Sequence, residues 1–115
     1  MSTPTTTLRR RFTQADVDAF GQVSGGTGHI HTDPEFAAAT RFGRPLVQGL
    51  FLLGLVERAL DETAPDWADL QVRFVAPVRV GDEFVVTVAE DADGTLQVTG
   101  STEETTLVGV ATRRT

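Results

Sequence analysis

The chain of 115 residues contains no cysteine and no lysine. The absence of cysteine excludes disulfides, thiolate nucleophiles and cysteine-ligated metals, and it leaves the redox compartment undecided. The absence of lysine excludes Schiff-base catalysis, the lysine of a phosphate-binding P-loop and covalent attachment of pyridoxal phosphate. Covalent chemistry through either side chain is therefore ruled out.

The sequence also lacks a large basic patch and a long apolar run. The formal net charge is −6, and arginines cluster only at residues 9–11 and 113–114, so we expect no nucleic-acid partner. The N-terminal residues 1–12 contain no apolar run, so we expect no signal peptide and a cytoplasmic protein. The longest apolar stretch, residues 46–60, is shorter than the about 20 residues that cross a bilayer, so we expect no membrane association. The length predicts one domain over residues 1–115.

That apolar stretch is the centre of the predicted fold. Only Gln48, Glu57 and Arg58 are clearly polar between residues 46 and 60. A helix that is apolar on all sides is expected to be enclosed by the rest of the chain. We therefore predict a central core helix over residues 46–61.

The remaining chain predicts short helices followed by strands. Thr13 is a good N-cap for a helix over 14–23, with Asp16 in its first turn, and the glycine-rich residues 24–28 end it. Another helix is expected over 34–41, and a first strand over 7–12. Alternating patterns predict strands at 70–75, 84–88, 95–99 and 106–112, with a hairpin turn at 91–94. The predicted class is α+β, an antiparallel sheet of four to six strands curled around one helix.

Two motifs suggest sites that the composition does not support. His29, His31 and Asp33 alternate like metal ligands, but the sequence contains no third histidine and no cysteine to complete a coordination shell. The Gly-Gly-Thr-Gly run at residues 25–28 is not followed by the lysine of a phosphate loop. We therefore expect no metal and no cofactor.

Residues 20–49 carry a more specific pattern. They contain Ser24-Gly25, His31 and Asp33 at fixed spacing, then Phe42-Gly43, then Val47 and Gly49. This pattern resembles the MaoC-like family, the (R)-specific enoyl-CoA hydratases and related 3-hydroxyacyl-thioester dehydratases with the hot-dog fold. The later run Phe74-Val75-Ala76-Pro77-Val78 with Gly81-Asp82 is also similar to that family, so the resemblance covers nearly the whole chain.

The resemblance implies an acyl-thioester lyase, and it assigns residues to roles. His31 matches the family's acid/base histidine, and Gly49 matches the residue whose N–H holds the thioester carbonyl. Gly26 stands where the family has its catalytic Asp, and glycine cannot act as an acid or a base. The resemblance further implies a homodimer and a substrate carried on coenzyme A or an acyl carrier protein. The implied substrate-binding residues are Ser24, Gly26, Gly28, His29, Asp33, Val47 and Gln48.

The glycine at position 26 leaves three outcomes open. Asp33, His29 or a carboxylate of a partner chain replaces the missing Asp. Alternatively, the histidine alone suffices for double-bond isomerisation or a conjugate addition. In the third, the protein keeps the acyl pocket as a non-catalytic binding or scaffold subunit.

A weaker alternative is a thioesterase that uses Glu57 on the central helix. Four arginines are candidates for the phosphates of the carrier: Arg41, Arg44, Arg73 and Arg79.

Overall fold

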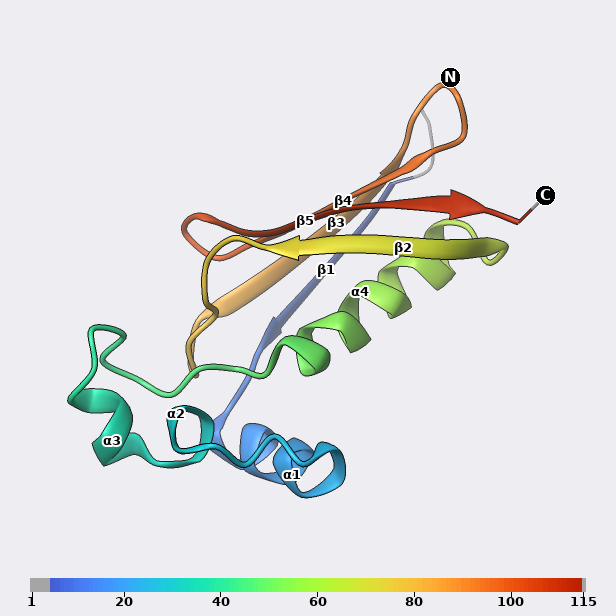
Figure 1. Ribbon diagram of the computed structural model, residues 1–115. Coiled ribbons are helices and arrows are strands. Elements are labelled where there is room, and N and C mark those ends of the chain that lie inside the picture. Colours follow the sequence, from blue (N-terminus) through green and yellow to red (C-terminus); the bar gives the residue numbers. More distant parts are fainter. Residues whose placement is uncertain (1–4, 115) are drawn as a thin grey trace.

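The computed structural model describes residues 5–114. In chain order its elements are β1 (Thr5–Arg11), α1 (Gln14–Ser24), α2 (His29–Thr32), α3 (Pro34–Ala38), α4 (Gly49–Thr63), β2 (Trp67–Phe74), β3 (Glu83–Glu90), β4 (Leu96–Ser101) and β5 (Thr105–Arg113). The strands form one antiparallel sheet in the order β1-β3-β4-β5-β2. Figure 1 shows α4 lying along one face of this sheet, with α1, α2 and α3 gathered near the end where α4 begins. This arrangement confirms the predicted α+β class.

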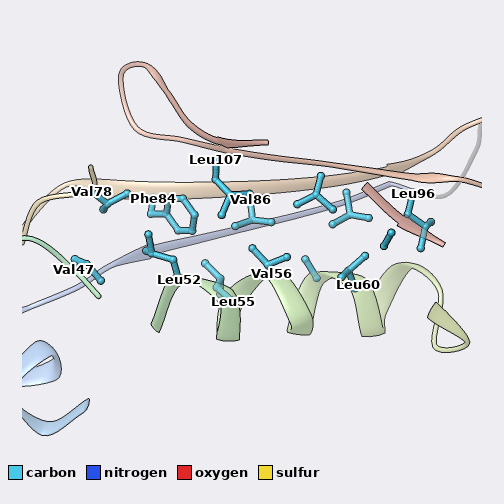
Figure 2. Close-up of a cluster of buried hydrophobic side chains, with 14 of the residues drawn as sticks. Val47, Leu52, Leu55, Val56, Leu60, Val78, Phe84, Val86, Leu96 and Leu107 are labelled. Atoms are coloured by element: carbon cyan, nitrogen blue, oxygen red, sulfur yellow. The ribbon is translucent and has the colours of Figure 1, made fainter. Parts of the chain in front are cut away.

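The core lies between the sheet and α4. Strand β3 alternates, so that Phe84, Val86 and Val88 are buried while the residues between them are partly exposed. From the helix, Leu52 and Val56 pack against this face, together with other buried side chains of α4 (Figure 2). Burying each such side chain stabilises the fold by about 1.5–3 kcal/mol. This packing fixes the helix on the sheet and thereby places its N-terminus.

The start and the end of α1 follow the predicted local signals. The Thr13 side chain accepts a hydrogen bond from the Asp16 N–H, and the Asp16 carboxylate accepts one from the Thr13 N–H, forming a capping box. Gly25 ends the helix at φ 83°, a left-handed conformation that favours glycine. Phe20 of this helix stacks on Phe51 of α4 with 4.5 Å between the ring centroids, which joins the two helices.

Two expectations about the central helix are wrong. The helix begins at Gly49 rather than at residue 46, because Leu46 pairs with Arg79 in an isolated bridge and the Val47 N–H donates to the Val78 carbonyl at 2.8 Å. These apolar residues belong to an extended segment, in which Val47 is buried and Leu46 is partly buried, and they do not continue the helix. The helix is also not enclosed on every side within one chain, since Leu50 is 65 % exposed.

Other boundaries differ by a few residues. The short α2 was not predicted, and α3 ends at Ala38 rather than at residue 41. Strand β1 begins and ends earlier than predicted, at Thr5 and Arg11. The β3–β4 hairpin is confirmed: Asp91 and Thr95 are joined by a main-chain bond, and Gly94 has φ 85°. In the part of the chain that the structure describes, no helix is long and apolar enough to span a membrane.

Candidate active site

A cavity of about 370 Å³ opens where α4 begins. Its walls come from α2, from the extended segment that enters α4, from the first turn of α4 and from the end of β2 with the loop that follows. The lining residues are His31, Leu46, Val47, Gly49, Leu52, Phe74, Val75, Ala76, Pro77 and Val78. His31 is the one residue of this lining with a titratable side chain. The structure therefore places the two predicted catalytic residues, His31 and Gly49, on the same cavity.

The His31 ring is held in one orientation by the main chain. Its Nδ1 lies 2.8 Å from the carbonyl oxygen of Leu46. A carbonyl oxygen can only accept, so Nδ1 carries the hydrogen and the neutral ring keeps its lone pair on Nε2. The His31 backbone is fixed too, because its N–H donates to the Gly28 carbonyl and its carbonyl accepts from the Gln14 side chain. The arrangement leaves Nε2 as the atom able to take up or release a proton.

Gly49 is the first residue of α4, after the N-cap Gln48. Within residues 5–114 no hydrogen bond uses the Gly49 N–H, whereas the Phe51 and Leu52 N–H groups both donate to the Gln48 carbonyl. A free N–H at a helix N-terminus favours a nearby negative charge, as on a developing oxyanion. A Cβ added at Gly49 would lie 3.2 Å from Cζ of Phe74, so a glycine here lets that ring close over the start of the helix.

Gly26 packs against a buried amide. Gln48 is 5 % exposed, and its Nε2 donates to the Val17 carbonyl at 2.9 Å and to the Gly26 carbonyl at 3.0 Å. Its Oε1 is buried and has no partner among the described residues. A Cβ at Gly26 would lie 3.1 Å from Cγ of Gln48 and 3.3 Å from Oγ of Ser24, so a side chain there requires its neighbours to shift.

The predicted substrate-binding residues are not all at the cavity. Val47 lines it, whereas Ser24, Gly26, Gly28, His29, Asp33 and Gln48 are outside the lining. The Asp33 carboxylate caps α3 by accepting from the Glu35 and Phe36 N–H groups, each at 3.1 Å. His29 is exposed and packs edge-on against Phe36. Contact of these residues with a substrate stays a prediction.

Sequence reasoning missed most of the apolar wall. The sequence patterns assign Leu46, Leu52 and the run from Phe74 to Val78 to the fold, whereas the structure places them in the cavity lining. The sequence of that run carries one indication of its position, because Pro77 interrupts the preceding alternation and so indicates an irregular segment after the strand. Phe74 and Val75 are 47 % and 49 % exposed, which is high for large apolar side chains.

Three of the four arginines that are candidates for the carrier phosphates already have partners of their own. Arg44 and Arg79, two of the candidates for carrier phosphates, both contact the Asp82 carboxylate, at 2.8 and 3.4 Å. Partial burial acts to raise the pKa of Asp82, but the hydrogen bonds from Arg44 and from the Arg79 N–H outweigh it and hold that pKa below its ordinary value. Arg41 lies over the Phe42 ring. An open depression of about 920 Å³ near Arg44 and Arg79 is lined by both signs of charge, so it offers no clear preference for an anion.

Glu57 does not reach the cavity. It lies on the exposed side of α4 and is absent from the lining of the site, so this chain's geometry does not favour hydrolysis through that carboxylate. Among residues 5–114 there is also no group of three or more histidine, cysteine, aspartate or glutamate side chains arranged to hold a metal ion. The His29, His31 and Asp33 motif is divided among an aromatic contact, a bond to Leu46 and a helix cap.

Comparisons with known proteins agree with this architecture. The chain is 38 % identical over 85 residues to the (R)-specific enoyl-CoA hydratase of Aeromonas caviae, a match that covers 70 % of this chain and 63 % of that protein. It is 35 % identical over 89 residues to 3-hydroxybutyryl-CoA dehydratase of Methylorubrum extorquens, covering 72 % of this chain and 57 % of that protein. The match thus spans less than two thirds of the length of either relative.

The structural comparison extends further along the chain. The solved (R)-hydratase from A. caviae superposes with a TM-score of 0.84 at 30 % identity, covering 99 % of this chain and 97 % of that one. A family model described as "MaoC like domain" matches residues 2–112. This chain therefore belongs to the MaoC-like domain family.

Proposed function

We propose that this protein is a hydratase, a dehydratase or a related double-bond isomerase that acts on an acyl thioester carried on coenzyme A or an acyl carrier protein. The observation that carries the proposal is that His31 and Gly49 line one apolar cavity. The relatives named as hydratases and dehydratases support the substrate class. Neither a metal nor a cofactor is required by this chemistry.

The proposed roles use the polar atoms of the two lining residues, His31 and Gly49. The thioester carbonyl oxygen accepts a hydrogen bond from the Gly49 N–H, which lies at the positive end of α4. That bond strengthens as the oxygen gains enolate character. It therefore lowers the barrier for Cα to gain or lose a proton. His31 Nε2 transfers the proton, and the Leu46 carbonyl stabilises the imidazolium through Nδ1.

The direct test uses crotonyl and longer 2-enoyl thioesters, with loss of the conjugated absorbance as the readout. We expect turnover by the unmodified protein and a loss of about 10²–10⁴-fold in His31→Asn. Asparagine can still donate to the Leu46 carbonyl but has no counterpart of Nε2. Equal rates for the two proteins would exclude His31 as the acid/base.

We also propose a homodimer joined through the β2 edge of the sheet. Strands β1 and β2 are the two sheet edges. Three successive arginines, Arg9, Arg10 and Arg11, lie on the β1 edge, and such charges oppose strand pairing. At the β2 end, Phe74 and Val75 are half-exposed, and they also line the cavity. A second copy would cover these side chains and close the cavity, with the acyl chain near the interface.

A cytoplasmic location stays a prediction.

A non-catalytic acyl-binding subunit is the second candidate. The observation that favours it is the single titratable side chain at the cavity, with glycine at position 26. Binding of a saturated acyl thioester, measured by calorimetry, with no turnover of any enoyl thioester would support this candidate. Turnover that depends on His31 would exclude it.

A further inference from the structure

We propose that the reaction best suited to this site is the isomerisation of a 3-enoyl thioester to the conjugated 2-enoyl thioester. The inference rests on the proposed function, because it uses the same cavity, the same histidine and the same main-chain donor. It names the reaction class that needs one proton-transferring side chain and no water. Two independent features of the site support it.

The first feature is the lack of a second polar side chain at the cavity. Apart from His31, every lining residue is glycine, alanine, proline or an aliphatic or aromatic residue. Hydration requires a water molecule to be held against Cβ and oriented while a base takes its proton. Among the described residues that line this cavity, Nε2 of His31 is the only side-chain acceptor, so it would have to orient the water and take its proton without help from a second side chain. An allylic proton shift has no such requirement.

The second feature is the packing of Gln48 beside Gly26. The resemblance expects the second acid/base at position 26, where this chain has glycine; a Cβ there would lie 3.1 Å from Cγ and 3.7 Å from Nε2 of Gln48, so a longer side chain would meet that residue. That amide is fixed by its two bonds to the Val17 and Gly26 carbonyls. An amide does not transfer protons at neutral pH. The space next to Gly26 is therefore taken by a neutral residue that cannot act as an acid or a base.

The proposed step balances without any additional reactant. His31 Nε2 removes a proton from C2 of the 3-enoyl thioester, and the C–H electron pair forms a dienolate whose oxygen is stabilised by the Gly49 N–H. The imidazolium then returns the proton to C4. The C3=C4 pair becomes the new C4–H bond, the carbonyl re-forms and the double bond lies between C2 and C3. C2 and C4 are separated by one carbon, so one nitrogen on one face of the chain can serve both.

The experiment compares 3-hexenoyl-CoA and 2-hexenoyl-CoA as substrates for the same preparation of the full chain. Isomerisation is followed by the appearance of the conjugated enoyl absorbance, hydration by its loss, and both products are identified by NMR. We expect isomerisation to exceed hydration by at least about 10-fold. We expect His31→Asn to lose about 10²–10⁴-fold of the isomerisation rate. Glu103→Gln, an exposed change on the β4–β5 turn, serves as the matched control for preparation and folding.

Three results would overturn the inference, and they separate it from the proposed function. Hydration as fast as isomerisation, or faster, would leave a hydratase and reject the one-base reaction. Isomerisation that survives unchanged in His31→Asn would reject the assigned base. No turnover of either substrate, with hexanoyl-CoA still bound in calorimetry, would reject both reactions and leave an acyl-binding protein.

Discussion

The imidazole of His31 and the carbonyl of Leu46 are joined by a hydrogen bond of 2.8 Å. This bond connects α2 to the extended segment that enters α4 three residues later, at Gly49. The His31 ring and the free Gly49 N–H are therefore positioned by one continuous piece of main chain. A change in the path of residues 46–48 moves both groups together.

Replacement of His31 separates its chemical role from its structural one. His31→Ala removes the bond to Leu46 and is expected to lower the free energy of unfolding by about 1 kcal/mol. His31→Asn retains a donor, so its free energy of unfolding should fall by less than half of that amount. Both variants should lose the same turnover of enoyl thioesters. Urea unfolding measures the difference. If the two variants are equally destabilised, the Leu46 bond contributes little to stability.

Gln48→Ala should be one of the most destabilising single changes near the site. It leaves the Val17 and Gly26 carbonyls without their buried donor and opens a cavity, for an expected loss of about 2–4 kcal/mol. Gln22→Ala, on the exposed side of α1, is the matched control and should stay within about 0.5 kcal/mol of the unmodified protein. A loss below about 1 kcal/mol for Gln48→Ala would mean that the amide is not fixed as described.

A carboxylate introduced at position 26 should shift the reaction toward hydration. Gly26→Asp introduces the carboxylate that the resemblance expects at this position, and we expect the ratio of hydration to isomerisation to rise by at least about 10-fold. Gly26→Asn has the same shape without an acid or base, so it should leave the ratio near its original value. Both variants are expected to be about 1 kcal/mol less stable, because their Cβ lies close to Gln48 and Ser24. Equal ratios in the two variants would contradict the one-base account.

The stability of the protein should fall in acid partly through Asp82. The folded-state pKa of this carboxyl lies below the ordinary value of 3.8 because Arg44 and Arg79 bind its ionised form. Its contribution is therefore present at pH values above about 4 and is lost as the pH falls through the lower folded-state value. Asp82→Asn should cost about 1 kcal/mol at pH 7 and make unfolding less dependent on pH between about 2 and 4. An unchanged acid dependence would show that Asp82 does not contribute to it.

The proposed dimer depends on the β2 edge. Val75→Glu places a charge on the half-exposed apolar surface and should convert the dimer to a monomer. The matched control is Val23→Glu on α1, where the side chain is 86 % exposed and lies outside the proposed interface. Sedimentation velocity distinguishes the two states. A dimer that persists in Val75→Glu would place the interface elsewhere.

The elements with strong local signals were predictable from the sequence. The Thr13 capping box and Gly25 define α1 almost to the residue, and the alternation of apolar residues defines β3 and β4. The start of α4 was placed three residues too early because Leu46 and Val47 are as apolar as the helix they precede. Their burial depends on pairing with residues 78 and 79, which lie far along the chain and leave no local trace. The helix α2 has only 4 residues, which is too few to show the helical periodicity of apolar residues.

The candidate site was predicted in part. The motif spacing identified His31 and Gly49, and the structure brings both to one cavity. The walls contributed by Phe74 and Val75 depend on the position of an edge strand beside the helix start, which only the folded chain defines. The contact between Gln48 and Gly26 is also tertiary, because 22 positions separate the two residues. The spacing of residues in the sequence identifies which residues can take part in the site. The residues that surround them are determined by tertiary packing.

The most direct test is a crystal structure of the protein with a bound non-reactive saturated acyl thioester, such as hexanoyl-CoA. We predict that the thioester oxygen lies within hydrogen-bonding distance of the Gly49 nitrogen, with Cα facing Nε2 of His31 and the acyl chain against Phe74 and Val75. An acyl group bound away from both His31 and Gly49 would contradict the account.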